Sequence, residues 1–253
     1  MANKLKYFIG NWKMFGNQHS ISILYRINKF LTKKQHFRKN KKIVFCVPYT
    51  LINHFSRNLK NKFIHIGAQN CHHAQTFAPN TGSVNASMIK KSGAEYVILG
   101  HSDNRIEGDS NQVIRKKIES AINQNLNVIF CIGETKKEKK TKKTFQVLRR
   151  QINDSLNKKF NSSKIIIAYE PVWSIGSGKM PKPIDLKKII QFIKSEYAKI
   201  FKGVKLPKIL YGGSVSGRNI SLFSTIEEID GFLIGGASQS SKKFIDIINN
   251  YYK

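Results

Sequence analysis

The chain has 253 residues, of which 40% are hydrophobic, so it is long enough to bury a sizeable core in one domain of about 250 residues. It contains no apolar stretch of about 18 residues and no signal-peptide core before its first apolar run, so we expect a cytoplasmic protein without membrane contact. Its three cysteines are widely separated and form no CxxC pair, which argues against a disulfide framework.

The formal net charge of +29 invites a nucleic-acid interpretation, because a positive field attracts polyanions without a specific site. However, the lysines are spread over most of the predicted helices and loops, with one dense run at 136–143. They are not interleaved with exposed aromatic residues as in single-strand binders. Lys, Asn and Ile, which have A+T-rich codons, are abundant together. We therefore attribute the charge to codon composition and expect no specific nucleic-acid partner.

One short region superficially resembles a set of metal ligands. It contains His65, Cys71, His72 and His73. Their spacing matches no zinc pattern, and adjacent histidines on one strand would face opposite ways. We therefore expect no metal site.

Short apolar runs and helical segments alternate along the whole chain. In the first half, strands are predicted at 7–12, 42–47, 63–68 and 96–100, with helices at 20–31 and 86–91 and a long loop at 69–84. In the second half, strands are predicted at 127–132, 165–169, 208–211 and 231–234, with helices at 110–124, 143–156 and 184–200. We expect a helical segment after each strand.

Eight short strands that are apolar throughout indicate a parallel α/β sheet covered on both faces. The simplest closure of eight such units is a single (β/α)8 barrel domain spanning residues 1–253. A doubly wound sheet is the alternative, but it needs a GxGxxG turn after its first strand. Residues 10–16 read GNWKMFG and do not match that pattern.

In such a barrel the carboxyl ends of the strands converge on one face, which gathers the polar residues that follow them. These are Asn11 and Lys13 after the first strand, His101 after the fourth, and Glu170 after the sixth. A carboxylate can take a proton from carbon, an imidazole can donate to a carbonyl oxygen, and an ammonium can stabilise the resulting charge. Together they favour proton abstraction beside a carbonyl, although each alone also fits a structural role. For Glu134, after the fifth strand, we prefer a cap or ion pair.

Two further features point to a phosphorylated substrate held under a lid. Small-residue turns at 211–215 and 234–238 follow the seventh and eighth strands, where barrels usually bind phosphate through backbone N–H groups. The glycine-rich segment after Glu170 has an apolar tip at 175–178, a composition that suits a closing lid. An ordinary loop behind a capping glutamate is the simpler alternative.

Six motifs resemble the triosephosphate isomerase family and occur in the same order over nearly the whole chain. They are GNWKM at 10–14, GHS at 100–102, CIGET at 131–135, AYEPVW at 168–173, YGGSV at 211–215 and DGFLIGGAS at 230–238. The resemblance implies a TIM barrel that interconverts dihydroxyacetone phosphate and D-glyceraldehyde 3-phosphate in glycolysis and gluconeogenesis. It implies no metal and no organic cofactor.

The resemblance also implies a role for each residue at the strand ends. Glu170 would be the base that moves the proton, and His101 would polarise the carbonyl as a neutral imidazole. Lys13 would stabilise the enediolate and help to hold the phosphate, while Asn11 would bind a substrate oxygen. The neutral imidazole, the base and the closing loop are established features of this family and are carried over from it.

Phosphate would bind the backbone N–H groups of Gly176, Ser214, Gly235 and Gly236. The lid would exclude water and so protect the enediolate. Its residues would be Pro171, Val172, Trp173, Ser174, Ile175, Gly176, Ser177, Gly178 and Lys179. Members of the family are usually homodimers in which the long loop after the third strand reaches the partner's active site, and Thr81 matches the threonine that makes this contact.

Three departures from the family pattern bear on function. Asp103 and Asn104 stand where Glu and Arg are usual, and we expect the shorter aspartate to hold Lys13 less firmly and to reduce turnover. Ser83 replaces a usual glutamate of the dimer loop, which weakens the case for a strong interface. Met180 and Pro181 give the lid an unusual second hinge.

Two alternatives remain at this stage. The first is another phosphate-binding barrel enzyme, such as an epimerase or an indole-pathway enzyme, which would need different residues at the strand ends. The second is a catalytically impaired basic barrel that binds polyanions. That protein would bind polyanions tightly, with a steep salt dependence, and would show negligible isomerisation.

Overall fold

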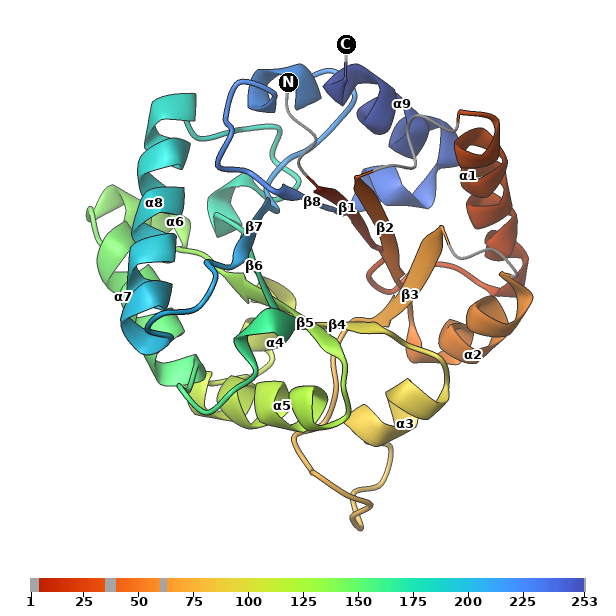
Figure 1. Ribbon diagram of the computed structural model, residues 1–253, viewed down its shortest axis with the longest axis horizontal. Helices are drawn as coiled ribbons and strands as arrows, with labels where there is room; N and C mark the ends of the chain where they lie inside the picture. Colours follow the sequence, from red (N-terminus) through yellow and green to blue (C-terminus); the bar gives the residue numbers. More distant parts are fainter. Residues whose placement is uncertain (1–4, 35–39, 60–62, 253) are drawn as a thin grey trace.

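The computed structural model describes residues 5–34, 40–59 and 63–252. Its strands pair in parallel with their sequence neighbours, and the last pairs with the first, so the sheet closes into an eight-stranded barrel. Figure 1 looks down this barrel, with the strands at the centre and the helices around them. The strands are β1 (Lys6–Asn11), β2 (Lys41–Cys46), β3 (Ile64–Ala68), β4 (Tyr96–Leu99), β5 (Asn127–Ile132), β6 (Ile165–Tyr169), β7 (Lys208–Tyr211) and β8 (Gly231–Ile234).

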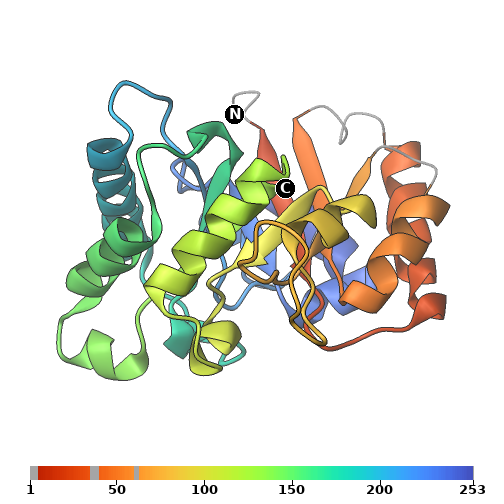
Figure 2. The same cartoon turned by 90° about the horizontal axis from the view of Figure 1, so that it is seen from below.

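The helices lie along the outside of the strands, as the side view in Figure 2 shows. Those of the described ranges are α1 (Ile21–Lys33), α2 (Tyr49–Asn58), α3 (Ala86–Lys91), α4 (Ser102–Ile106), α5 (Asn111–Asn123), α6 (Lys136–Lys140), α7 (Thr144–Ser155), α8 (Pro183–Ile200) and α9 (Ser241–Tyr251). Short 3-10 turns occur at Gln18–Ser20, Ser162–Lys164, Val172–Ser174, Ile220–Phe223 and Gly236–Gln239. Over these same ranges, no helix has both the length and the apolar character needed to cross a lipid bilayer.

Two hydrophobic layers explain why the strands are apolar throughout. On β1, Phe8 packs outward against the helices and Ile9 packs inward among the barrel residues. Because both faces of each strand are buried, neither face needs polar residues, and the runs show no alternation. The interior layer consists of Ile9, Val44, Cys46, Tyr96, Ile98, Ile129, Cys131, Ile166, Ala168, Leu210 and Leu233.

The predicted barrel is confirmed, and the predicted strands agree with the observed ones to within one or two residues. The expectation of a helix after every strand is wrong after β7, which is followed by the 3-10 turn Ile220–Phe223. There the side chain of Asn219 accepts from Ser216 N–H at 2.8 Å and donates to the Ser214 carbonyl at 3.1 Å. Such local side-chain bonds offer the backbone an alternative to helix. The sequence pattern predicted bounds for α1, α3, α5, α7 and α8 but none for α2, α4, α6 or α9.

Gly231 allows the last strand to close against the first. A Cβ at this position would lie 2.1 Å from the backbone oxygen of Tyr7 on β1. Gly231 and Tyr7 are register partners in the β1–β8 pair, so no side chain fits between the two strands here. Barrel closure therefore depends on glycine at this site.

We predict that Gly231→Ala lowers the free energy of unfolding by roughly 3 kcal/mol, the upper end of the range typical of overpacking. Gly236→Ala is the matched control, because a Cβ there meets no atom within 4 Å. Urea unfolding of the two variants measures the difference. Equal midpoints for both variants would contradict this account of closure.

Candidate active site

The carboxyl ends of the strands surround a cavity of about 300 Å³. Each residue predicted from the sequence to act in catalysis or to bind phosphate lines this cavity. These residues are Asn11, Lys13, His101, Glu170, Gly176, Ser214, Gly235 and Gly236. The volume lies at the lower end of the range found for small-molecule sites, which suits a small substrate.

Glu170 follows β6 and presents a buried carboxylate to the cavity. The residue is 4% exposed, and its Oε1 lies 3.5 Å from Nε2 of His101. Its Oε2 is also buried and has no hydrogen-bond partner among the described residues. Because an unpaired buried carboxylate oxygen is costly, it is expected mainly where function requires it. The arrangement leaves one carboxylate oxygen available to take a proton from a bound molecule.

Two glycines make room for this glutamate. A Cβ at Gly212 would lie 2.6 Å from Cγ of Glu170, and a Cβ at Gly133 would lie 1.9 Å from its backbone oxygen. Gly133 belongs to the CIGET motif after β5, and Gly212 belongs to the small-residue turn after β7. The glycines that follow β5 and β7, the two neighbours of β6, therefore leave the space through which Glu170 reaches the cavity.

The imidazole of His101 is oriented by the first turn of α4. Its Nδ1 accepts a hydrogen bond of 3.1 Å from the backbone N–H of Asp103. A nitrogen that accepts cannot carry the proton, so the ring is neutral with its proton on Nε2. The Asp103 carboxylate lies 3.4 Å from the same Nδ1 and would favour a charged ring. The backbone contact is the shorter of the two, and the carboxylate is already paired with Lys13.

Lys13 has a strained backbone, with φ at 55°, that local bonds hold in place. Its N–H donates to Oδ1 of Asn11 at 3.1 Å, and its carbonyl accepts from the Gln69 amide at 2.9 Å. Its ammonium lies 3.0 Å from Oδ2 of Asp103. This is an ordinary ion-pair distance, so the shorter aspartate does reach the lysine.

The segment predicted to form the lid, residues 171–179, contains the 3-10 turn Val172–Ser174, and Glu134 holds that turn. The carboxylate of Glu134 accepts from the indole N–H of Trp173 at 2.8 Å and from the Tyr169 hydroxyl at 3.0 Å. Burial raises the pKa of Glu134, while these hydrogen bonds oppose the shift. The preferred assignment of Glu134 as a cap or ion-pair partner is therefore corrected. Sequence reasoning missed the contact because Trp173 lies 39 residues further along the chain.

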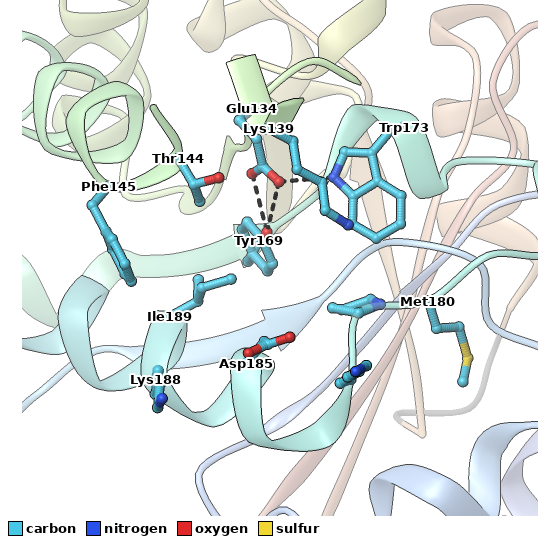
Figure 3. Close-up of a pocket in the computed structure, with 12 residues that line it drawn as sticks. Glu134, Lys139, Thr144, Phe145, Tyr169, Trp173, Met180, Asp185, Lys188 and Ile189 are labelled. Carbon is cyan, nitrogen blue, oxygen red and sulfur yellow. Dashed lines mark hydrogen bonds between the residues drawn. The ribbon is translucent and has the colours of Figure 1, made fainter. Parts of the chain in front are cut away.

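Figure 3 shows the side chains of Glu134, Tyr169 and Trp173 in a second cavity of about 540 Å³, which lies beside the lid. The ammonium of Lys139 lies 3.1 Å from the centroid of the Trp173 ring, close enough for a cation–π contact. Lys139 belongs to the dense lysine run at 136–143. Part of that run therefore packs against the base of the lid.

Arg105 is a further structural element of the site that the sequence analysis did not identify. Its guanidinium donates to the Gly100 carbonyl at 2.7 Å, to the Asn111 side chain at 2.8 Å and to the Cys131 carbonyl at 3.3 Å. It therefore joins the ends of β4 and β5, from which His101 and Glu134 follow. Nothing in the local pattern around Arg105 reveals these partners, because Cys131 is 26 residues away.

Residues outside the cavity include the proposed dimer contact and the superficial metal motif. Thr81 is exposed on the loop between β3 and α3, which projects from the barrel in Figure 1. Both ring nitrogens of His72 are engaged, one by Ala74 N–H at 3.2 Å and one by the Asn80 amide at 3.0 Å. Within the described ranges, no group of three or more His, Cys, Asp or Glu residues is placed to hold a metal ion.

Comparisons with known proteins cover the whole length of the chain. A family model described as triosephosphate isomerase matches residues 6–251. The triosephosphate isomerase of Bartonella henselae is 35% identical over 257 residues, with 100% of both chains covered. That of Aquifex aeolicus is 36% identical over 244 residues, which cover 95% of this chain and 97% of that protein.

A solved structure agrees with these sequence matches. The crystal structure of triosephosphate isomerase from Bartonella henselae is 35% identical and matches with a TM-score of 0.86, covering 98% of this chain and 99% of that one. The sequence matches and the structural match therefore both extend over nearly the whole chain. On this evidence, the chain belongs to the triosephosphate isomerase family.

Proposed function

We propose that Glu170, His101 and Lys13 interconvert dihydroxyacetone phosphate and D-glyceraldehyde 3-phosphate in the 300 Å³ cavity. Triosephosphate isomerase activity follows from the family and from the full-length relatives. The assignment of residues rests mainly on one observation. Oε2 of Glu170 is buried and unpaired, and the other oxygen of the same carboxylate lies 3.5 Å from His101 Nε2.

The reaction moves one proton between two neighbouring carbons and a second proton between the oxygens that these carbons carry, which the imidazole of His101 can relay. Glu170 takes the proton from the carbon beside the carbonyl and returns it to the other carbon. The Nε2–H of His101 donates to the carbonyl oxygen, and the ammonium of Lys13 stabilises the negative charge of the enediolate. Asn11, which is 5% exposed and lines the cavity, binds a substrate oxygen.

The phosphate of the substrate binds to backbone N–H groups on the other side of the cavity. The donors are those of Gly176, Ser214, Gly235 and Gly236. The three glycines support the assignment, because a Cβ built at Gly176, Gly235 or Gly236 points into open space with no atom within 4 Å. An anion can approach the backbone closely there, and the 3-10 turn Gly236–Gln239 begins at the same point.

The lid then covers the bound substrate. Ile175 and Gly176 at its tip line the cavity. Movement of the segment from Pro171 to Lys179 over the substrate excludes water, which strengthens the electrostatic interactions inside and protects the enediolate. The alternative of a catalytically impaired polyanion-binding barrel has no support in the site, where each proposed catalytic residue is present.

The partner of this chain is a second copy of itself. Several large apolar side chains are exposed on and near the loops around the site, including Met14 at 94%, Phe77 at 72% and Ile106 at 82%. Large apolar side chains exposed to this extent can be buried when a second subunit covers them. In the homodimer, Thr81 of the projecting loop contacts the other subunit beside its active site.

We predict that Glu170→Gln lowers kcat by about 10²- to 10⁴-fold, the range for loss of a general base. A coupled assay with glyceraldehyde 3-phosphate, run with and without a metal chelator, measures the effect. The matched control is Glu107→Gln, which changes an exposed carboxylate outside the cavity and should keep full activity. Comparable rates for the two variants would contradict the role of Glu170.

We predict that Gly236→Ala raises KM about tenfold or more, because the added methyl group blocks one of the N–H donors to the phosphate. A hydrogen bond to a charged group contributes about 1.5–3 kcal/mol, and about 1.4 kcal/mol corresponds to a factor of ten. Steady-state kinetics together with the unfolding midpoint provide the test. An unchanged KM in a stable variant would remove Gly236 from the phosphate site.

We predict that the protein sediments with twice its chain mass of 28.9 kDa. Phe77→Lys should reduce the sedimentation mass to that of one chain and lower kcat, because it places a charge on an apolar side chain of the projecting loop. Lys91→Ala, whose ammonium lies over the Phe77 ring at 5.3 Å, is the control that leaves the apolar surface intact. A fully active protein of single-chain mass would overturn the homodimer.

A further inference from the structure

The second cavity, of about 540 Å³, is lined by residues of the lid segment and of the helices α6, α7 and α8. Its lining comes from three stretches of the chain, 134–145, 169–173 and 180–189, and we call it the lid-side cavity. The lid-side cavity is larger than the active cavity, and the two share no lining residue in the part of the chain that the structure describes. Its volume falls well within the range of small-molecule sites. The chain therefore has room for a ligand that is not its substrate.

One part of the lid-side cavity is aromatic and apolar. Tyr169 and Ile189 are buried there, and Figure 3 shows the rings of Phe145 and Trp173 on either side of Tyr169. Phe145 is 44% exposed, although Phe192 already packs against it with the ring centroids 4.7 Å apart. A ring that still contacts water is stabilised when an apolar body covers it. The cavity therefore offers an apolar contact surface that is already formed.

Three lysines also line the lid-side cavity and give it a positive charge. Lys182 and Lys188 are exposed, and the ammonium of neither is paired with a carboxylate among the described residues. The third, Lys139, places its ammonium 3.1 Å from the centroid of the Trp173 ring. Because a ring face attracts a cation without neutralising it, the charge of Lys139 adds to that of the other two lysines.

The two acidic residues of the lid-side cavity leave much of this charge uncancelled. The carboxylate of Glu134 already accepts from Trp173 at 2.8 Å and from the Tyr169 hydroxyl at 3.0 Å. Asp185 lies in the first turn of α8, where the N–H groups at the start of the helix carry partial positive charge that offsets a carboxylate. Lys182 and Lys188 are therefore left to face an anion from outside the protein.

From this combination we infer that the lid-side cavity binds a small organic anion with an aromatic or other apolar body. The body lies against Phe145 and Trp173, and the acidic group meets Lys182 and Lys188. A lysine ammonium is a flexible point charge, so a carboxylate, a sulfonate or a phosphate ester can each serve as the acidic group. This inference goes beyond the proposed isomerase reaction, because no residue of that reaction lines the lid-side cavity.

The high charge of the whole protein decides how the inference is tested. A net charge of +29 attracts any anion, so weak anion binding by itself is no sign of a site. A site in the lid-side cavity instead requires the apolar body and the acidic group on the same molecule. Anilinonaphthalene sulfonate has both, its neutral relative N-phenylnaphthylamine has only the body, and inorganic sulfate has only the charge.

The location of the probe is measured by NMR of the two tryptophans, Trp12 and Trp173. The indole N–H of Trp173 donates to Glu134 in the lid-side cavity, whereas that of Trp12 donates to the Ser238 carbonyl at 3.1 Å, outside it. Anilinonaphthalene sulfonate should shift the Trp173 signal until it saturates and leave the Trp12 signal in place. The other two probes should bind at least about tenfold more weakly. Trp173→Phe assigns the two signals.

Two double variants separate the site from the general field of the protein. Lys182→Gln with Lys188→Gln removes the two ammoniums proposed to meet the anion and should raise the Kd of anilinonaphthalene sulfonate about tenfold. Lys116→Gln with Lys187→Gln removes the same charge from exposed helix positions outside the cavity and should change Kd by less than about twofold. Lys187 is next to Lys188 in sequence, but its ammonium lies 3.2 Å from Oε1 of Glu228.

Three results would overturn the inference. Equal weakening in the two double variants would mean that the probe responds only to the field of the protein. Equally tight binding of N-phenylnaphthylamine would mean that the charge has no part in recognition. Movement of the Trp12 signal together with that of Trp173 would place the probe elsewhere or indicate a loosened fold.

Gly236→Ala distinguishes failure of this inference from failure of the proposed function. This variant alters the proposed phosphate site, so it should bind anilinonaphthalene sulfonate as the wild-type protein does. If it loses affinity for the probe, the probe occupies the active cavity, which overturns this inference and leaves the proposed function intact. If the Trp173 signal responds as expected in a wild-type protein that shows no isomerase activity, the inference is supported and the proposed function alone has failed.

Discussion

The contact between Glu170 and His101 is the interaction on which the rest of the site depends. It requires a buried carboxylate within 3.5 Å of an imidazole, with one oxygen left unpaired. Burying such a group is unfavourable unless the surrounding structure holds it there. The closed barrel does this by placing the ends of β4 and β6 on one face, and Gly133 and Gly212 leave the space that the glutamate needs.

Around this pair, the backbone contributes as much to the chemistry as the side chains do. The N–H of Asp103 sets the tautomer of His101, and local bonds stabilise the strained φ of Lys13. The proposed phosphate donors are backbone groups at glycine-rich turns. An anion site made of N–H groups needs no positive side chain, which explains how a chain with a net charge of +29 can place few lysines in its active cavity.

The lid is anchored by contacts that lie outside the cavity. Glu134 holds Trp173 near the start of the lid, and Ser174 joins the start of the lid to its end. Neither residue touches the space where the substrate binds. Both are nearly inaccessible to water, so their hydrogen bonds compete little with solvent and hold the base of the lid in a defined position.

The order of apolar runs by itself determined the barrel, because strands buried on both faces must be apolar throughout and eight of them close most simply on themselves. The polar residues that follow the predicted strands likewise identified the cavity residues, because parallel strands bring their carboxyl ends together. Only the tertiary structure decided the distant partners of Glu134, Arg105 and Ser174, namely Trp173, Cys131 and Ser214, which lie 26 to 40 residues away along the chain. The reason is physical: periodicity reports which face of an element is buried, whereas such contacts depend on how packed elements meet.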